Sequence, residues 1–187
     1  MTRAIRLTLF ALAALAATGC GYNRIQALDE QANSAKGQIA AQLQRRADLI
    51  PNLVETVKGY AKQELTVFTE VAEARAKLAG SIQTGDPAQM AEANQAMNAP
   101  LGRLLALVEN YPQLKSDQNF RQLQDELTGT ENRIAVARQD YNSAAQQYNT
   151  FVRTFPYNLT AKVFGASQLK PYFEAKAGAE EAPAVKF

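Results

Sequence analysis

Apolar and small residues recur at steps of three and four from Phe120 to Phe155. They stand at positions 120, 123, 127, 130, 134, 137, 141, 144, 148, 151 and 155, and most residues between them are polar. Such alternation, unbroken over about five heptads, is typical of one long helix with a seam that faces partner helices. Stripes with the same spacing cover 22–43, 49–78 and 90–111. The pattern therefore predicts an all-α chain.

Turn signals divide these stripes into separate helices. The clearest is Gly85-Asp86-Pro87, where Asp86 can cap the next helix and Pro87 can occupy its first position. Ser116-Asp117 opens the longest stripe. We therefore expect an antiparallel four-helix bundle with a long final helix that overhangs the others. The expected helices are 22–48, 49–80, 87–111 and 117–155.

Pro51 decides between two arrangements of the first half of the chain. If Asp48 is an N-cap, Pro51 lies in the first turn of a second helix, where its missing N–H is no loss. The alternative is a three-helix bundle in which Pro51 only kinks a first helix that runs from Tyr22 to Ala79. We favour the break, because the resulting helices match the later ones in length.

The helical pattern stops at Pro156. Prolines at 156, 171 and 183 and glycines at 165 and 178 interrupt the rest of the chain. We therefore expect the helical bundle to occupy 20–155 and an irregular tail to occupy 156–187, with roughly the last ten residues disordered. The tail aromatics, among them Phe164 and Tyr172, are expected to fold back onto the bundle. The alternative is that they form a patch that binds a partner.

The N-terminal segment has the composition of an export signal. Arg3 and Arg6 precede a nearly continuous apolar run over 7–17, and small residues follow. The run is shorter than the roughly 20 residues that span a bilayer, and it fits a signal peptide over 1–19. Residues 17–20, Ala-Thr-Gly-Cys, resemble a bacterial lipobox, in which cleavage leaves Cys20 at the mature N-terminus carrying lipid. The alternatives are an ordinary signal with a chance cysteine and an uncleaved anchor.

Cys20 is the single cysteine of the chain, so it cannot form an internal disulfide. Two or more acyl chains hold a protein stably on a membrane. We therefore expect an exported lipoprotein that faces the periplasm and is attached to membrane lipid through acylated Cys20. Gly21 follows in place of an aspartate, which resembles outer-membrane sorting in a Gram-negative bacterium.

Charge and composition narrow the function. The chain has 20 Lys and Arg against 18 Asp and Glu, and removal of Arg3 and Arg6 with the signal leaves 18 against 18. A neutral mature chain gives no support to nucleic-acid binding. Histidine is absent, and with it the commonest general base and metal ligand. We see no close set of carboxylates on an apolar face and no Gly-rich phosphate loop, and we expect no enzyme, cofactor or metal site.

The densest group of polar residues lies in the expected corner around Pro51. In an interaction site, Arg45 and Arg46 would contact an anion or a head group, and Asn52 would anchor a partner by hydrogen bonds. The structural alternative is a capped corner whose arginines pair with Asp48 or Glu55.

The pair Tyr-Asn occurs at 141–142 and again one heptad later at 148–149. Both tyrosines therefore share the expected seam, and both asparagines lie beside it. Tyrosines whose hydroxyls reach the edge of a bundle are ordinary core residues. The alternative is that the two pairs bind a ligand.

Two blocks of the sequence resemble the LemA family of bacterial proteins. The first is 43–60, LQRRADLIPNLVETVKGY, and the second is 138–149, RQDYNSAAQQYN, followed by Phe155-Pro156 and Phe164-Gly165. The resemblance covers essentially the whole mature chain. It implies a helical bundle held at a membrane, usually by an N-terminal transmembrane helix, and it supplies no catalytic residues. This chain departs from the family pattern by its lipobox at Cys20.

These observations predict a membrane-anchored, non-enzymatic LemA-type protein that binds a protein partner in the periplasm and acts as an interaction or scaffold module. The alternatives are a small-ligand or lipid-handling module and an accessory factor of a membrane protease. The candidate interaction residues are Arg45, Arg46, Asp48, Pro51, Asn52, Arg138, Tyr141, Asn142, Tyr148, Asn149, Phe164 and Tyr172.

Overall fold

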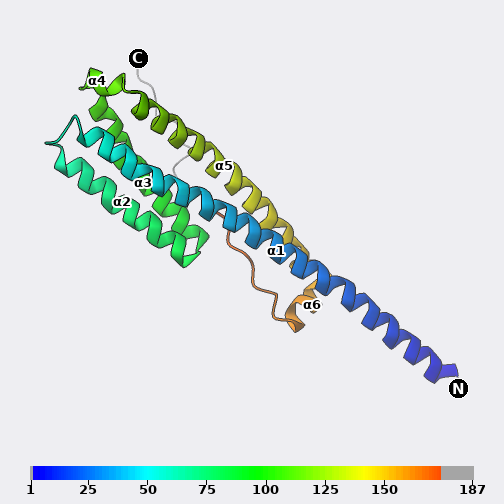
Figure 1. Cartoon of the computed structure of the whole chain (residues 1–187). Coiled ribbons are helices and arrows are strands. Elements are labelled where there is room, and N and C mark those ends of the chain that lie inside the picture. The colour runs from blue at the N-terminus through cyan, green and yellow to red at the C-terminus, as the bar shows by residue number, and fades with distance from the viewer. Residues whose placement is uncertain (1, 174–187) are drawn as a thin grey trace, which may run out of the picture.

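The computed structural model describes residues 2–173, except for the side chains of 2, 4–7 and 9–20, and every regular element in that part is a helix. The helices are α1 (Thr2–Lys58), α2 (Leu65–Thr84), α3 (Pro87–Val108), α4 (Pro112–Lys115), α5 (Gln118–Arg153) and α6 (Tyr157–Val163). Figure 1 shows α1 and α5 packed side by side in opposite directions, with the α2–α3 hairpin against one end of the pair. The predicted all-α bundle of four long helices is confirmed.

The predicted break before Pro51 is wrong. The helix α1 runs without interruption for 57 residues, with Pro51 inside it, so Asp48 is not an N-cap. The three-helix alternative is also wrong, because α1 ends at Lys58 and α2 starts only at Leu65. The stripe on α1 explains the continuity: Ala47, Ile50, Leu53, Val54 and Val57 are all buried on the same face. A helix that continues through Pro51 keeps this face in the core, and the free energy gained by burying it exceeds the free energy lost at the proline.

The hydrogen bond that Pro51 cannot make is replaced from another helix. A proline inside a helix has no N–H to donate to the carbonyl four residues earlier, which here belongs to Ala47. Arg75 of α2 donates its Nε–H to that carbonyl oxygen at 2.8 Å. The α1 backbone is thereby satisfied, and α2 is tied to α1 at the proline.

The other helix ends follow local capping. The side chain of Asp86 accepts a hydrogen bond from the Ala88 N–H at 3.0 Å, with Pro87 at the start of α3, and Asp117 accepts one from Phe120 N–H at 2.9 Å. The cap at Asp86 was predicted, and so was the start of the long helix at Ser116-Asp117. The helix α2 ends at Thr84, four residues after the predicted end at Gly80, and Gly85 caps it in the left-handed region at φ 66°. The helix α3 ends at Val108 and α5 spans Gln118–Arg153, each within three residues of the predicted limits.

The first helix, not the final one, overhangs the others. At 1.5 Å per residue, the 57 residues of α1 are about 85 Å long and the 36 residues of α5 about 54 Å. The N-terminal part of α1 projects beyond the bundle in Figure 1. Among the residues that the structure describes, none of the helices combines the length and the apolar character needed to cross a membrane.

Two groups of buried side chains hold the helices together. The larger core joins α1, α2, α3 and α5 and includes Leu43, Met97 and Ile134. The smaller one, which we call the α6 cluster, joins α1, α5 and α6 through Ile25, Leu28, Tyr148, Val152 and Ala161. The predicted seam of α5 is buried at 120, 130, 134, 137, 141, 144 and 148, whereas Phe155 at its end is exposed.

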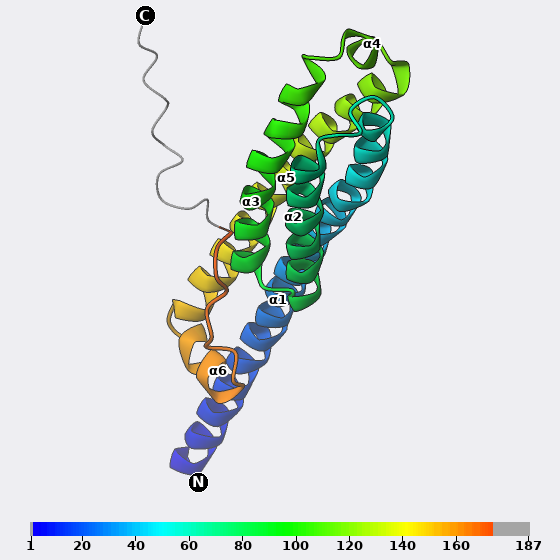
Figure 2. The ribbon, with the colours of Figure 1, turned by 90° about the vertical axis from the view of Figure 1, so that its left-hand side faces the viewer.

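The tail is less irregular than predicted. After a cis Phe155–Pro156 peptide the chain forms α6, and the described residues that follow α6, 164–173, lack helical structure. That segment, which we call the C-terminal strap, runs back from α6 along the bundle in Figure 2. The expected disorder of roughly the last ten residues falls outside the described residues.

Candidate functional site

The two adjacent arginines of the first block have opposite surroundings. Arg46 is buried between α1, α3 and α5. Its guanidinium donates hydrogen bonds to Asn94 and, at 2.9 Å, to Asn98 of α3, and it pairs with Glu131 of α5 at 2.6 Å. Burial lowers the pKa of Arg46 and the charge of Glu131 opposes that shift; an arginine stays charged in proteins. Arg46 is therefore a buried cation that connects three helices.

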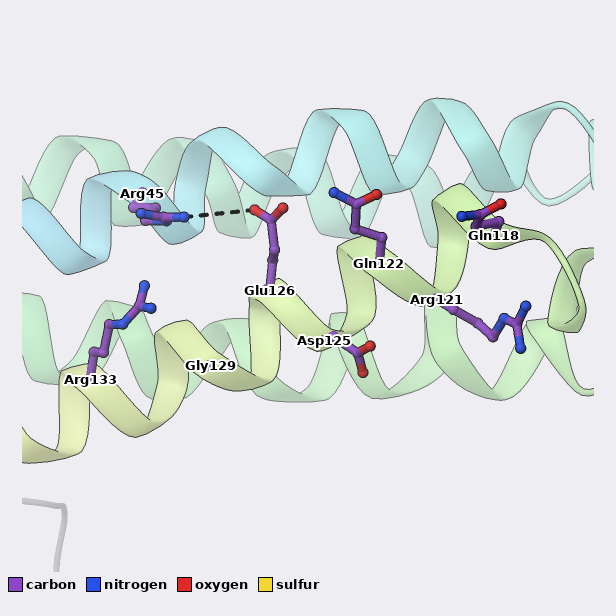
Figure 3. A pocket seen from close by; sticks show the side chains of 8 residues that line it. All are labelled: Arg45, Gln118, Arg121, Gln122, Asp125, Glu126, Gly129 and Arg133. Atoms are coloured by element: carbon purple, nitrogen blue, oxygen red, sulfur yellow. Dashed lines mark ion pairs between the residues drawn. The ribbon is translucent and has the colours of Figure 1, made fainter.

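Arg45 faces a polar groove between α1 and α5. Its guanidinium lies 3.8 Å from the Glu126 carboxylate, and both groups are solvent-exposed. In Figure 3, Glu126 and Gln122 point toward α1, whereas Asp125 and Arg121 point away from it. The groove encloses about 540 Å³. Its lining, which we call the α1–α5 groove, is Arg45, Gln118, Arg121, Gln122, Asp125, Glu126, Gly129 and Arg133.

The other predicted residues of this block lie on α1 itself. Asp48 is exposed and accepts a hydrogen bond from the Gln44 amide at 2.8 Å. The Asn52 side chain is exposed, and the backbone carbonyl oxygen of Asn52 accepts a hydrogen bond from the Thr56 hydroxyl at 2.8 Å. The expected pairing of the arginines with Asp48 or Glu55 is wrong, because their carboxylate partners belong to α5 and Glu55 pairs with Lys58. The structure does not bring Arg45, Arg46, Asp48 and Asn52 together into one site.

The two Tyr-Asn pairs of α5 hold the C-terminal strap by its backbone. The Asn149 side chain accepts the N–H of Lys170 at 2.8 Å and donates to its carbonyl oxygen at 2.9 Å. Asn142 makes the same two bonds to Phe173, at 2.8 and 3.2 Å. Three residues of extended chain span about 10 Å, close to one heptad of helix. Asparagines seven residues apart on α5 therefore meet residues three apart on the strap.

Both tyrosine hydroxyls also bind this segment. Tyr141 donates to the carbonyl oxygen of Pro171 at 2.8 Å, and Tyr148 donates to that of Ala166 at 2.9 Å. Burial is the main cause that raises the pKa of each phenol, and a carboxylate, Asp86 for Tyr141 and Asp29 for Tyr148, raises it further. The tyrosine rings are buried in the bundle as the seam predicted. Their hydroxyls and the adjacent asparagines recognise backbone atoms.

Side chains of the strap complete its attachment. Lys170 pairs with Asp29 of α1 at 2.8 Å, and its Nζ lies 5.0 Å from the centre of the Tyr148 ring. Phe173 is buried in the main core, and the guanidinium of Arg138 lies 4.9 Å from the centre of its ring. The prediction that tail aromatics fold back is therefore correct for Phe173, whereas Tyr172 is exposed.

The remaining predicted residues lie at the opposite end of the bundle from the α4 turn. Cys20 is part of α1, and its side chain is outside the description. Phe164 is exposed, with its ring centre 4.7 Å from that of Tyr22. Among the described residues, no group of three or more His, Cys, Asp and Glu side chains has the arrangement that could hold a metal ion.

Sequence reasoning missed the partners of these residues. Asn94, Asn98 and Glu131 around Arg46, and Lys170 and Phe173 on the strap, carry no local signal, because each contact joins residues distant in sequence. One signal was present for Arg46. It lies three residues after Leu43 and four before Ile50, which is a position that the helical stripe assigns to the core.

The sequence is similar to a family model and to several known proteins. A sequence model described as the LemA family matches residues 35–187. Magnetosome protein MamQ 2 of Paramagnetospirillum magneticum is 28% identical over 182 residues, covering 84% of this chain and 66% of that protein. Magnetosome protein MamQ of Magnetospirillum gryphiswaldense is 25% identical with the same coverage. Protein LemA of Metamycoplasma hominis is 27% identical over 139 residues, which are 70% of this chain and 62% of that protein. The chain thus spans slightly less than two thirds of these relatives.

Proposed function

From the premise that the chain belongs to the LemA family, we propose that it is a membrane-anchored, non-enzymatic protein that docks a protein partner through the α1–α5 groove. The groove itself is the observation that carries the proposal. Three arginines and two acids line it, and within the described residues Arg121 and Arg133 form no ion pair. Arginine is enriched at protein interfaces, and charge complementarity favours a partner with an acidic segment.

The membrane attachment that we propose is lipid on Cys20, with the bundle facing the periplasm, on the outer rather than the inner membrane if the cell has both. The continuity of α1 supports a close attachment. The helix passes Cys20 without interruption and reaches buried Ile25 five residues later, so no flexible linker separates the anchor from the folded part. Arg45 lies 25 residues further along the same helix, about 38 Å from Cys20. The groove is therefore held away from the bilayer.

Crosslinking in living cells tests the docking surface. A photoreactive amino acid replaces Gln122 in the groove or, as a control, exposed Lys77 on α2. We expect a reproducible crosslinked species from position 122 that is lost when Arg121 and Arg133 are both changed to Glu. The matched reversal Lys77→Glu should leave it unchanged. Equal crosslinking in both charge-reversed proteins, or no crosslink from position 122, would reject the groove as the docking surface.

Metabolic labelling with an alkynyl fatty acid tests the anchor. The wild-type chain should incorporate the label, lose residues 1–19 and show the mass of an acylated N-terminal cysteine. The variant Cys20→Ser should incorporate none. A wild-type protein with an unmodified Cys20 thiol would contradict the lipoprotein proposal, whatever the crosslinking experiment shows.

One observation favours the alternative of a small-ligand module. A cavity of about 250 Å³ lies beside Arg46, and its lining combines the cation with apolar side chains. The lining residues are Arg46, Asn98, Leu101, Gly102, Leu105, Gln124, Leu127, Thr128 and Glu131. An amphipathic anion would match this lining. Native mass spectrometry of the protein extracted from its membrane would show a bound species if this function is correct, and only the unliganded mass if it is not.

A further inference from the structure

Exposed apolar side chains gather beside the N-terminal part of α1. The group, which we call the apolar corner, comprises Tyr22 at the start of the bundle and Phe155, Leu159, Val163 and Phe164 in and around α6. Val163 is 79% exposed and Phe155 is 74% exposed. Contiguous exposed apolar groups of this kind mark surfaces that contact another phase or molecule.

The helix α6, which carries most of the apolar corner, packs directly against α1. At Gly21, a Cβ atom would lie 2.8 Å from the Tyr157 ring, so the absent side chain lets α6 approach the helix directly. Thr160 and Ala161 are buried on the same inner face of α6, and the rings of Phe151 and Tyr157 stack with their centres 4.3 Å apart. Figure 2 shows α6 against α1 and the end of α5.

The outer face of α6 is therefore presented by a helix whose inner face packs on α1 and α5. Leu159 and Val163 are four residues apart in one helix and share this face. Lys162 lies beside them and is exposed. The arrangement is that of a short amphipathic element with an apolar face and a basic edge.

The two stretches of sequence that carry the corner contain basic residues and no acidic ones. No acidic residue occurs between Asp140 and Glu174, and none precedes Asp29. Arg24, Arg153 and Lys162 are exposed in these two stretches. A basic surface beside exposed apolar groups is complementary to a bilayer that contains anionic lipid. An ordinary solvated surface explains the basic residues by themselves but not the clustering of Phe155, Leu159, Val163 and Phe164.

We propose that the apolar corner lies in the interface of an anionic lipid bilayer, with Leu159, Val163 and Phe164 among the lipids and Arg153 and Lys162 at the head groups. The inference rests on the proposed attachment at Cys20, because that residue directly precedes Gly21, which α6 contacts. A single anchor leaves a rod free to tilt. A second contact beside it restricts the tilt and holds the α1–α5 groove toward the periplasm.

A fluorescent label reports whether position 163 enters lipid. Acylation blocks the only native thiol, so Val163→Cys provides one free site in the full-length protein. Leu65→Cys is the matched control, an exposed aliphatic residue at the start of α2. Both proteins are labelled with an environment-sensitive maleimide dye and reconstituted into vesicles of phosphatidylethanolamine and phosphatidylglycerol. Brominated lipids quench a dye that lies among the acyl chains.

We expect a blue-shifted emission at position 163 that brominated lipid quenches, and a water-like, unquenched emission at position 65. The changes Arg153→Glu and Lys162→Glu should reduce the quenching in anionic vesicles and have little effect in vesicles of phosphatidylcholine alone. Removing one apolar anchor, by Phe164→Asp, should lower partitioning of the corner roughly tenfold.

The remaining outcomes distinguish the proposed bilayer contact of the apolar corner from the proposed lipid anchor at Cys20. If the protein floats with the vesicles but the dye at position 163 has the same water-like emission as the dye at position 65, the proposed bilayer contact of the apolar corner is wrong. The proposed lipid anchor at Cys20 is then unaffected. A blue shift without quenching by brominated lipid means that a second protein molecule covers the corner, which also overturns the proposal. Labelling of the wild-type thiol overturns acylation, and position 163 is then read in protein that also carries Cys20→Ser, which leaves one thiol. A protein that does not float with vesicles overturns both.

Discussion

Neighbouring residues on one helix can have unrelated roles, as Arg45 and Arg46 show. Successive positions of an α-helix differ by about 100° in direction. Arg46 therefore points into the bundle, to Glu131, Asn94 and Asn98, while Arg45 points to the surface. A buried cation without partners is costly, so Arg46 specifies the positions of α3 and α5 as well as occupying the core.

The two arginines predict very different stability effects. Arg46→Ala should lower the free energy of unfolding by about 2–3 kcal/mol, because it leaves the buried Asn94 amide and the Glu131 carboxylate without their partner. Arg45→Ala should change it by about 0.5 kcal/mol or less, because its pair with Glu126 is long and exposed. Urea denaturation of both variants measures the difference. Equal losses would mean that the contacts of Arg46 contribute little.

The buried tyrosines predict that the folded state becomes less stable at alkaline pH. Burial holds the pKa of Tyr148 above the ordinary value of 10.0, and the nearby Asp29 carboxylate raises it further. The folded state thus binds the phenolic proton more tightly than the unfolded chain does. Stability should be constant below the ordinary pKa and should decrease as the pH rises above it. Urea midpoints measured across that range should fall less steeply for Tyr148→Phe, which has no proton to lose. If the urea midpoint falls equally steeply with pH in the variant and the wild type, Tyr148 does not cause the loss of stability at alkaline pH.

Among the elements, α1 shows how a helix tolerates an internal proline. The missing N–H of Pro51 would leave the Ala47 carbonyl unsatisfied in a partly buried position, and the guanidinium of Arg75 fills that place from α2. The contact should contribute most when position 51 is proline, since an N–H at that position would give the Ala47 carbonyl a donor within the helix. Pro51 and Arg75 should therefore be energetically coupled.

A double-mutant cycle measures this coupling. Arg75→Ala alone should destabilise the protein by about 1–2 kcal/mol, because the Ala47 carbonyl then has no donor. In a Pro51→Ala background the same change should cost less by about 1 kcal/mol, because the restored N–H replaces the guanidinium. Chemical denaturation of the four proteins provides the values. Additive effects would show that Arg75 acts independently of the proline.

At the scale of the whole molecule, the two buried clusters differ greatly in size. The main core contains 28 buried residues and the α6 cluster contains five in the part of the chain that is described. Small clusters open at lower free energy than the whole protein unfolds. The end that carries α6 should therefore open while the α2–α3 end stays folded.

Hydrogen exchange separates the two clusters. Val152→Ala should speed amide exchange in 21–28 and 148–163 and leave exchange in 39–54 unchanged, because Val152 packs only in the α6 cluster. Leu43→Ala should instead lower global stability by about 3 kcal/mol, since Leu43 is completely buried in the main core. If Val152→Ala speeds exchange equally in both regions, the molecule unfolds as one unit.

The sequence by itself determined the features that depend on local chemistry and period. The three-and-four spacing of apolar residues established the helices and the seam of α5, and Asp86, Pro87 and Asp117 established two helix starts through contacts within one turn. It also placed Tyr141 and Tyr148 on the buried face with Asn142 and Asn149 beside them. These features follow from residues at most a few positions apart.

Only the tertiary structure decided what those residues contact. The helix passes through Pro51 because an arginine 24 residues later donates to the carbonyl oxygen that the proline leaves without a partner. Arg46 is buried because α3 and α5 supply its acceptors. The Tyr-Asn pairs bind the C-terminal strap because three residues of the strap are as long as one heptad of α5. Each outcome depends on groups that are brought together by packing of the entire bundle. No local sequence pattern specifies these contacts, because the free energy of a buried polar group depends on whether a residue distant in sequence forms a hydrogen bond or ion pair with it.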